Sequence, residues 1–366
     1  MGAFPGVDPI PLPAPVWLFK LLNVVTLVLH FYAVHFLVGG LAVAILWRAM
    51  GKSRPAMARG SDEIVRRLPL VMTYVINLGI PPLLFTQVLY GRALYTSSVL
   101  IGFWWLSVIF LIIFSYALLY SMAKRVETNK TYGWVALIAL IVVLKVGMIY
   151  SANMTLMLRP ESWNAMYATS TAGMYLPGGD PTTTPRWLYM MLASVGVTGI
   201  ALMLLPTRLD EDHPARALLR SWGGKLLALF SAVEIAMGMW VYYAQPEAVR
   251  SGLTGNSFYL LFFALWLITA LALIGTGLLA ASRTGYALPS LCAVASFVNV
   301  LAMVLLRDGI RDVSLSVHGL NVWDRAVVAN WSTIILFLIL FVVAVGLVLW
   351  MGKVLLTAQR ETAQHG

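Results

Sequence analysis

The feature that most constrains this sequence is a series of nine apolar stretches, each long enough to cross a lipid bilayer. A hydrocarbon core of about 30 Å takes about 20 apolar residues of α-helix per crossing. Transmembrane β-barrels give alternating patterns, whereas these runs are continuous. The sequence therefore predicts an all-α fold, a polytopic membrane helix bundle of about nine transmembrane helices. The predicted spans are Val16–Trp47, Leu68–Tyr90, Val99–Met122, Gly133–Met157, Pro185–Leu205, Leu226–Tyr243, Phe258–Ala281, Leu288–Leu306 and Ala326–Trp350.

The composition excludes the other broad classes of protein. Of the 366 residues, 60% are hydrophobic and 11% are charged, whereas soluble domains carry about 25% charged residues. Disordered chains have the reverse profile, with few apolar residues. We expect residues 1–366 to form a single integral membrane domain surrounded by lipid. With one cysteine, Cys292, the chain can form no internal disulfide, and we expect neither an iron–sulfur cluster nor a flavin in it.

The basic residues predict how the chain is oriented. They gather in the first, third and fifth loops and in the C-terminal tail, and the positive-inside rule makes that side cytoplasmic. The N-terminus and the loops Leu158–Thr184 and Arg307–Asp324 are then outside. The net charge of +10 follows from this rule and does not predict nucleic-acid binding. We expect a multi-pass protein of a bacterial-type inner, or cytoplasmic, membrane. The basic residues are Arg48, Lys52, Arg54, Arg59, Arg66, Arg67, Lys124, Arg125, Lys130, Arg208, Arg216, Arg220, Lys225, Lys353 and Arg360.

Two histidines in the first span are candidate ligands. His30 and His35 are five residues apart, so on a helix their side chains point about 140° apart and cannot chelate one ion from one face. A neutral imidazole is a common haem ligand, with its second nitrogen held by another group. The alternative is that each histidine hydrogen-bonds to a neighbouring helix. Both interpretations remain open at this point.

Other polar or sulfur-bearing side chains in the spans are also candidates, because ionisable groups are costly in a bilayer. Lys145, Glu234 and Gln87 are candidates for a proton path, and Lys145 and Glu234 are alternatively a structural ion pair. Charged residues also cluster where the eighth span reaches the outer surface: Arg307, Asp308, Arg311 and Asp312. Four methionines are candidate thioether ligands, although most methionines in membrane helices fill space: Met190, Met191, Met237 and Met239.

Four motifs, in order, give the chain a resemblance to a known family. His30-Phe31 precedes Gly39-Gly40 in the first span, and the second span holds a Gly-rich stretch, 79–91. The fourth span ends in Ala-Asn-Met-Thr-Leu-Met-Leu-Arg-Pro, at 152–160, and the fifth holds Leu-Ala-Ser-Val-Gly-Val-Thr-Gly, at 192–199. Over about the first 200 residues the sequence resembles subunit I of the cytochrome bd quinol oxidases. That subunit also has nine spans and an external N-terminus.

The resemblance implies roles for several residues. His30 would be the axial ligand of the haem iron at the family's oxygen-reducing site. The family's second-helix carboxylate is Gln87 here, and its fifth-helix histidine, a ligand of the low-spin haem, aligns with Met190. Near the outer surface, Asp308 would take the place of the family's carboxylate as a weak ligand, and Arg311 that of its arginine. His35 is a possible second haem ligand.

The departures from the family determine the predicted function. The family's methionine ligand falls near Leu265, and the loop Gln245–Ser257 is too short for the family's quinol-binding loop. We therefore expect a haem-b-containing membrane subunit of a respiratory electron-transfer complex, working with other membrane subunits. Its donor would be an extracytoplasmic cytochrome c type protein and not quinol, and whether oxygen is the acceptor stays open. The alternatives are a transporter in which Lys145 and Glu234 line an ion path, and a haem-free membrane anchor.

Overall fold

The computed structural model describes residues 10–177 and 179–364, apart from several side chains near the end of the last helix. Eight of its helices are long and apolar enough to cross a membrane, which confirms the predicted polytopic helix bundle. The structure describes α-helices and short 3-10 turns, with one isolated β-bridge between Leu12 and Val327. The eight helices are α1 (Val16–Met50), α3 (Leu68–Leu100), α4 (Gly102–Glu127), α5 (Gly133–Leu156), α7 (Thr183–Leu204), α8 (Arg216–Tyr243), α10 (Ser257–Ser282) and α11 (Ala287–Val317).

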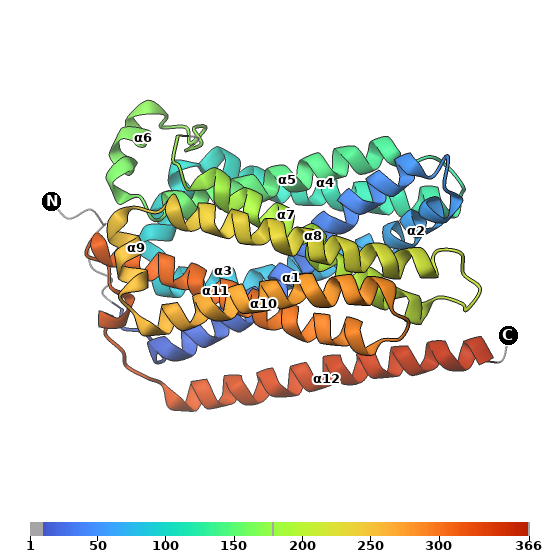
Figure 1. Cartoon of the computed structure of the whole chain (residues 1–366). Helices are drawn as coiled ribbons and strands as arrows, with labels where there is room; N and C mark the ends of the chain where they lie inside the picture. Colours follow the sequence, from blue (N-terminus) through green and yellow to red (C-terminus); the bar gives the residue numbers. More distant parts are fainter. Residues whose placement is uncertain (1–9, 178, 365–366) are drawn as a thin grey trace.

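The predicted ninth span corresponds to α12 (Trp331–Gln364), which begins five residues later than predicted. Its described apolar segment is Trp331–Leu347, which is shorter than the eight long helices. In Figure 1, α12 runs alongside the bundle and stands apart from it. Its packing against the bundle is through Ile334 and Leu338, which meet Leu18 and neighbouring residues of α1.

Several helix ends differ from the prediction. α8 begins at Arg216 instead of Leu226, and α3 continues to Leu100, with a non-helical Tyr90 (φ −127°, ψ 27°) at its kink. α11 continues to Val317, past the predicted end at Leu306. The predicted outer loop 307–324 therefore starts as helix. The predicted span ends at Leu306 because the next residue, Arg307, is charged. A helix can continue past charged residues when their side chains form ion pairs or hydrogen bonds.

Shorter elements occupy the connections and were not predicted. One end of the bundle carries α6 (Trp163–Thr169) and α9 (Glu247–Thr254), and the opposite end carries α2 (Pro55–Val65). We call the first of these the α6–α9 end (Figure 1). The remaining elements are the 3-10 turns η1 (Pro160–Ser162), η2 (Leu205–Arg208) and η3 (Val322–Asp324).

Glycines bring four of the long helices into backbone contact. A Cβ atom on Gly39 of α1 would collide with the Ser194 carbonyl of α7. Gly199 of α7 lies against the backbone of Gly223 in α8, and the next residue of α8 lies against Gly277 of α10 in the same way. Helices approach this closely in membranes only through small residues. α1, α7, α8 and α10 therefore form one tightly packed side of the bundle.

Candidate functional site

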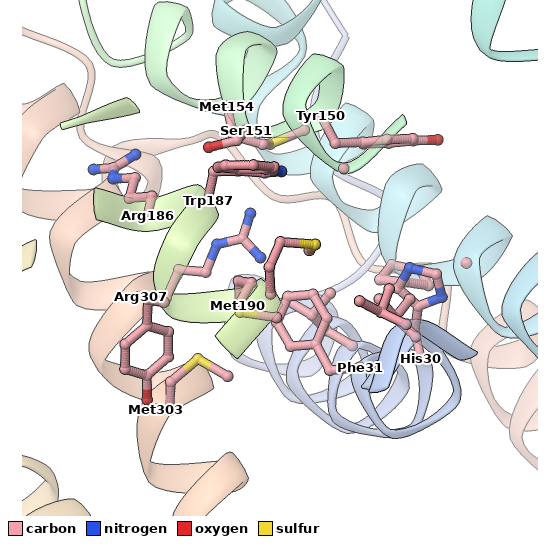
Figure 2. Close-up of a pocket in the computed structure, with 18 of the residues that line it drawn as sticks. His30, Phe31, Tyr150, Ser151, Met154, Arg186, Trp187, Met190, Met303 and Arg307 are labelled. Atoms are coloured by element: carbon pink, nitrogen blue, oxygen red, sulfur yellow. The ribbon is translucent and has the colours of Figure 1, made fainter. Parts of the chain in front are cut away.

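A cavity of about 430 Å³ lies inside the bundle. All eight long helices contribute to its wall, which is mostly apolar. Its volume is in the range of about 300–1,000 Å³ that is usual for ligand pockets. Polar groups on such a wall are few, so each one is informative about what the cavity binds. Figure 2 shows several of the residues that line it.

His30 of α1 lines this cavity. Its ring packs against Gly79 of α3: a Cβ atom at Gly79 would lie 2.8 Å from the ring Cε1 and 3.1 Å from Nδ1. The Nδ1 atom is buried and has no hydrogen-bond partner. Leaving a buried polar atom unpaired is costly. The His30 ring thus lies at the cavity wall with an unpartnered nitrogen on its Gly79 side, which makes it a candidate metal ligand.

His35 lies next to the cavity but is not part of its wall. The side chain is 1% exposed, and neither ring nitrogen has a hydrogen-bond partner. Its ring stacks on Phe31, with 6.2 Å between the centroids and 18° between the planes, while Phe31 lies 6.1 Å from the His30 ring. The two histidines therefore face different surroundings, as their helical spacing predicts. Sequence reasoning identified both histidines, and named Phe31 as part of a motif, but it did not predict that the Phe31 ring contacts both of them.

Three arginines line one part of the cavity: Arg186 of α7 and Arg307 and Arg311 of α11 (Figure 2 shows the first two). Arg186 donates to the Gln245 side-chain oxygen at 3.3 Å, and Arg307 lies 5.2 Å over the Phe31 ring. Guanidinium groups bind carboxylates and phosphates in bidentate geometry. This part of the cavity therefore suits an anionic group. Arg186 was not singled out from sequence, although it is an ionisable residue inside a predicted span.

A buried ionic cluster lies beside these arginines. The Lys20 Nζ atom is 2.7 Å from Asp308 and 2.6 Å from Asp312, and Tyr90 donates to Asp312. Arg311 reaches the cluster, 3.5 Å from an Asp308 oxygen. Lys20, Asp308 and Asp312 line a separate groove of about 520 Å³ between α1, α10 and α11. The structure thus brings Arg311 to the cavity, whereas Asp308 faces the groove.

The charges in this region do not balance. Among the described residues, five cations and three carboxylates interact here: Lys20, Arg159, Arg186, Arg307 and Arg311 against Asp180, Asp308 and Asp312. Arg186, Arg307 and Arg311 are close enough to interact with one another electrostatically. Two positive charges therefore remain on these residues. Like charges of this kind are stabilised by a bound anion.

Five methionines line the cavity, and they include Met190, which was predicted as a ligand. Of the other sequence candidates, Met191 also lines it, whereas Met237 and Met239 are not part of its wall. Met303, which sequence reasoning missed, is buried and lies in the same apolar cluster as Met190. The remaining two are Met72 and Met154.

The predicted proton-path residues lie apart from one another. Lys145 places its Nζ atom 4.1 Å from the Trp104 ring. Glu234 instead accepts hydrogen bonds from Tyr189 at 2.6 Å and Trp266 at 3.0 Å. No ion pair joins Lys145 to Glu234 in the part of the chain that the structure describes, and neither residue lines the cavity.

Gln87, the third residue of the predicted path, is half-buried on α3 and is not part of the cavity wall. It replaces the carboxylate that the resemblance leads one to expect in this helix. The neighbouring Thr86 does line the cavity, and its hydroxyl donates to the Pro82 carbonyl at 2.7 Å. The polar group that α3 presents to the cavity at this depth is therefore a hydroxyl.

An ion pair fastens the connection between α5 and α7 at the α6–α9 end. Arg159 Nε lies 2.8 Å from Asp180, whose other oxygen accepts from the Thr182 backbone and hydroxyl at 2.7 and 2.6 Å. Burial raises the pKa of Asp180, but the Thr182 hydrogen bonds and the Arg159 charge outweigh it and hold the pKa below its usual value. Arg186, on the cavity wall, follows in the first turn of α7.

Together these observations define a class of protein: a membrane helix bundle that encloses an apolar cavity with a free imidazole on its wall and an excess of positive charge at one side. Among solved structures, the bd oxidase from Geobacillus thermodenitrificans is similar, with a TM-score of 0.69 and 12% sequence identity. The match covers 92% of this chain and 96% of that chain. The chain therefore has a bd oxidase-like fold, as its motifs predicted. No protein-family model and no curated protein matches the sequence.

Proposed function

We propose that this chain is a haem-b-containing membrane subunit of a respiratory electron-transfer complex. The observation that carries the proposal is His30, whose buried Nδ1 has no partner and whose ring is seated on Gly79 at the cavity wall. The bd oxidase-like fold supports it. So does the excess of two positive charges at the cavity, which matches the two propionates of one haem.

Different residues at and behind the cavity wall would hold different parts of a bound haem. His30 is the proposed iron ligand, and His35, which lies behind the cavity wall with both nitrogens unpaired, is the second histidine candidate. Arg307 and Arg311 would bind carboxylates, and the apolar wall would exclude water and strengthen these contacts. Bound haem supplies one-electron transfer. The chain itself supplies ligation, orientation and charge neutralisation.

The connection between α8 and α10 bears on the identity of the electron donor. That connection is filled by α9, an eight-residue helix, which leaves no long loop of the kind that binds quinol in the family that the sequence resembles. We therefore propose that electrons come from an extracytoplasmic cytochrome c type donor. We also propose that residues 1–366 form one integral membrane domain, in a bacterial cytoplasmic membrane, beside other subunits.

Two other functions were open from the sequence. A transporter with Lys145 and Glu234 along an ion path is not favoured, because the two side chains have separate aromatic partners and neither lines the cavity. In the described part of the chain Glu234 is paired with no cation, and its two hydrogen-bond donors are enough to hold it in a structural role. A haem-free membrane anchor differs from the proposal in one measurable property, its haem content.

The test is a reduced-minus-oxidised spectrum with pyridine haemochrome quantification on the detergent-purified protein and whatever co-purifies with it. We expect non-covalent haem b at one or more per chain. The variant His30→Ala should lose haem while the fold is kept, because one lost ligand seldom unfolds so large a bundle. His318→Ala, in which the replaced imidazole is partly exposed beside Glu161, is the matched control. Unchanged haem in His30→Ala would refute the ligand assignment.

A further inference from the structure

The helix α3 exposes one stripe of side chains on the outside of the bundle. Between the first residue of α3 and its kink at Tyr90, the exposed residues follow one another at intervals of three or four. This spacing keeps them on one face of the helix, and we call that face the α3 stripe. It is also the spacing of a seam along which two helices pack. The members of the α3 stripe are Leu70, Tyr74, Asn77, Ile80, Leu84 and Val88.

Contact with lipid explains the apolar members of the α3 stripe but not Asn77. The run Leu68–Gly91 carries no charged residue, and Asn77 lies near its middle, so its exposed amide is at the depth of the hydrocarbon core. The amide Nδ2 donates to the Thr73 carbonyl at 2.8 Å. Within the described residues, its second N–H and its oxygen have no further partner. Hydrocarbon offers none either, so an exposed amide is costly there.

The chemistry of this face favours a second copy of the chain as the partner of Asn77. The residues that α3 and its neighbour α4 place in the core, 68–91 and 102–123, include no charged side chain, so two copies would not repel each other. An amide is both a donor and an acceptor, and it therefore pairs with a second amide. In a two-fold dimer each residue near the axis meets its own copy. A single asparagine in an apolar seam also fixes the register of two helices.

We propose that the chain forms a homodimer in the membrane along the α3 stripe, in which the Asn77 amides of the two copies hydrogen-bond to each other across a two-fold axis. Both copies have the same orientation in the bilayer, so the two α3 helices are parallel and the amides lie at the same depth. Leu70 and Leu84 each lie seven residues from Asn77, at nearly the same angle around the helix. Each of them therefore packs against its own copy, on either side of the amides. The homodimer is independent of the proposed function, because no haem takes part in it.

The first test is disulfide crosslinking of the full chain in isolated membranes, with Cys292→Ser to remove the native thiol. Leu84→Cys places a thiol on the α3 stripe and leaves Asn77 in place. A disulfide needs two Cα atoms about 4.4–6.8 Å apart, which equivalent positions of one seam reach. The control is Ile268→Cys on α10, where the replaced side chain is 63% exposed. Leu84 lies 16 residues from the start of α3 and Ile268 lies 14 residues from the end of α10, so the two thiols are at similar depths.

We expect a covalent dimer from Leu84→Cys and none from Ile268→Cys. The second test varies the amide itself and measures the dissociation constant of the dimer by energy transfer on dilution in lipid vesicles. Asn77→Leu should raise that constant about 5–30-fold and weaken the Leu84→Cys crosslink. Asn77→Gln keeps an amide and should retain most of both signals. Thermal unfolding checks that Asn77→Leu is folded, which we expect because leucine is the better helix former.

Three results would each overturn the proposal. The first is crosslinking of Leu84→Cys that is no faster than that of Ile268→Cys. The second is a dissociation constant that Asn77→Leu leaves unchanged. The third is a crosslink from Leu84→Cys to a different membrane protein, because the α3 stripe would then have another occupant. His30→Ala should leave the dimer unchanged, so a result on haem and a result on the dimer are read separately.

Discussion

Replacing Gly79 by alanine is a sharp test of His30 as a ligand, because it moves the imidazole without removing it. The new Cβ would lie 2.8 Å from the His30 Cε1 atom, whereas carbon atoms in contact prefer about 3.5–4.0 Å. The ring must therefore retreat by about 1 Å. Displacing the support of a metal ligand typically costs about 10–100-fold in affinity, or about 1.4–2.8 kcal/mol.

The assay is haem transfer from the purified protein to excess apomyoglobin, followed optically. Gly79→Ala should lose haem about 10–100-fold more readily than the unmodified protein. Its thermal unfolding should change little, because alanine is the better helix former by up to about 1 kcal/mol. The control is Gly275→Ala, where a Cβ meets nothing within 4 Å. Equal haem retention in both variants would refute the proposed contact between His30 and the iron.

Two further predictions concern charges outside the cavity. Lys20→Met removes the cation that joins the Asp308 and Asp312 carboxylates and leaves Arg311, 3.5 Å from Asp308, as their remaining partner. We expect a loss of up to about 3–5 kcal/mol in stability, seen as a lower melting temperature that Lys20→Arg largely avoids. Because the pKa of Asp180 is depressed in the folded chain, its stabilising effect is complete above the ordinary aspartate pKa of about 4 and is lost as the pH falls below it. Amide hydrogen exchange near Asp180 should accelerate over that acid range, and an Asp180→Asn variant should show no such pH dependence.

The sequence predicts the long helices well, because a membrane span needs only length and apolarity. It predicts the ends of the helices less well, because these depend on contacts with residues that are distant in the sequence. α11 runs past Leu306 because Asp308 and Asp312 are paired with Lys20, 288 and 292 residues away in the chain. Nothing in the local pattern around Arg307 reveals that pairing.

The candidate site was predictable only in part, for the same reason. His30 stands out as an ionisable residue in an apolar run, and Arg186 carries the same signal directly after Pro185. Gly79 begins the Gly-rich stretch that supports the resemblance, but its contact with the His30 ring is visible only in the fold. Met303 is one methionine among 17, and only the fold places it in the same cavity as Met190.

The glycine contacts that join α1, α7, α8 and α10 have a consequence for assembly. Because these four helices pack backbone against backbone, we expect little movement between them on that side of the cavity. On the opposite side, Ile80 of α3 lines the cavity and is also 52% exposed on the outside of the bundle. The cavity wall is one side chain thick there. If the chain binds haem as we propose, the α3 side is the thinner route by which a porphyrin would enter, and a bulky residue in place of Ile80 would slow its loading.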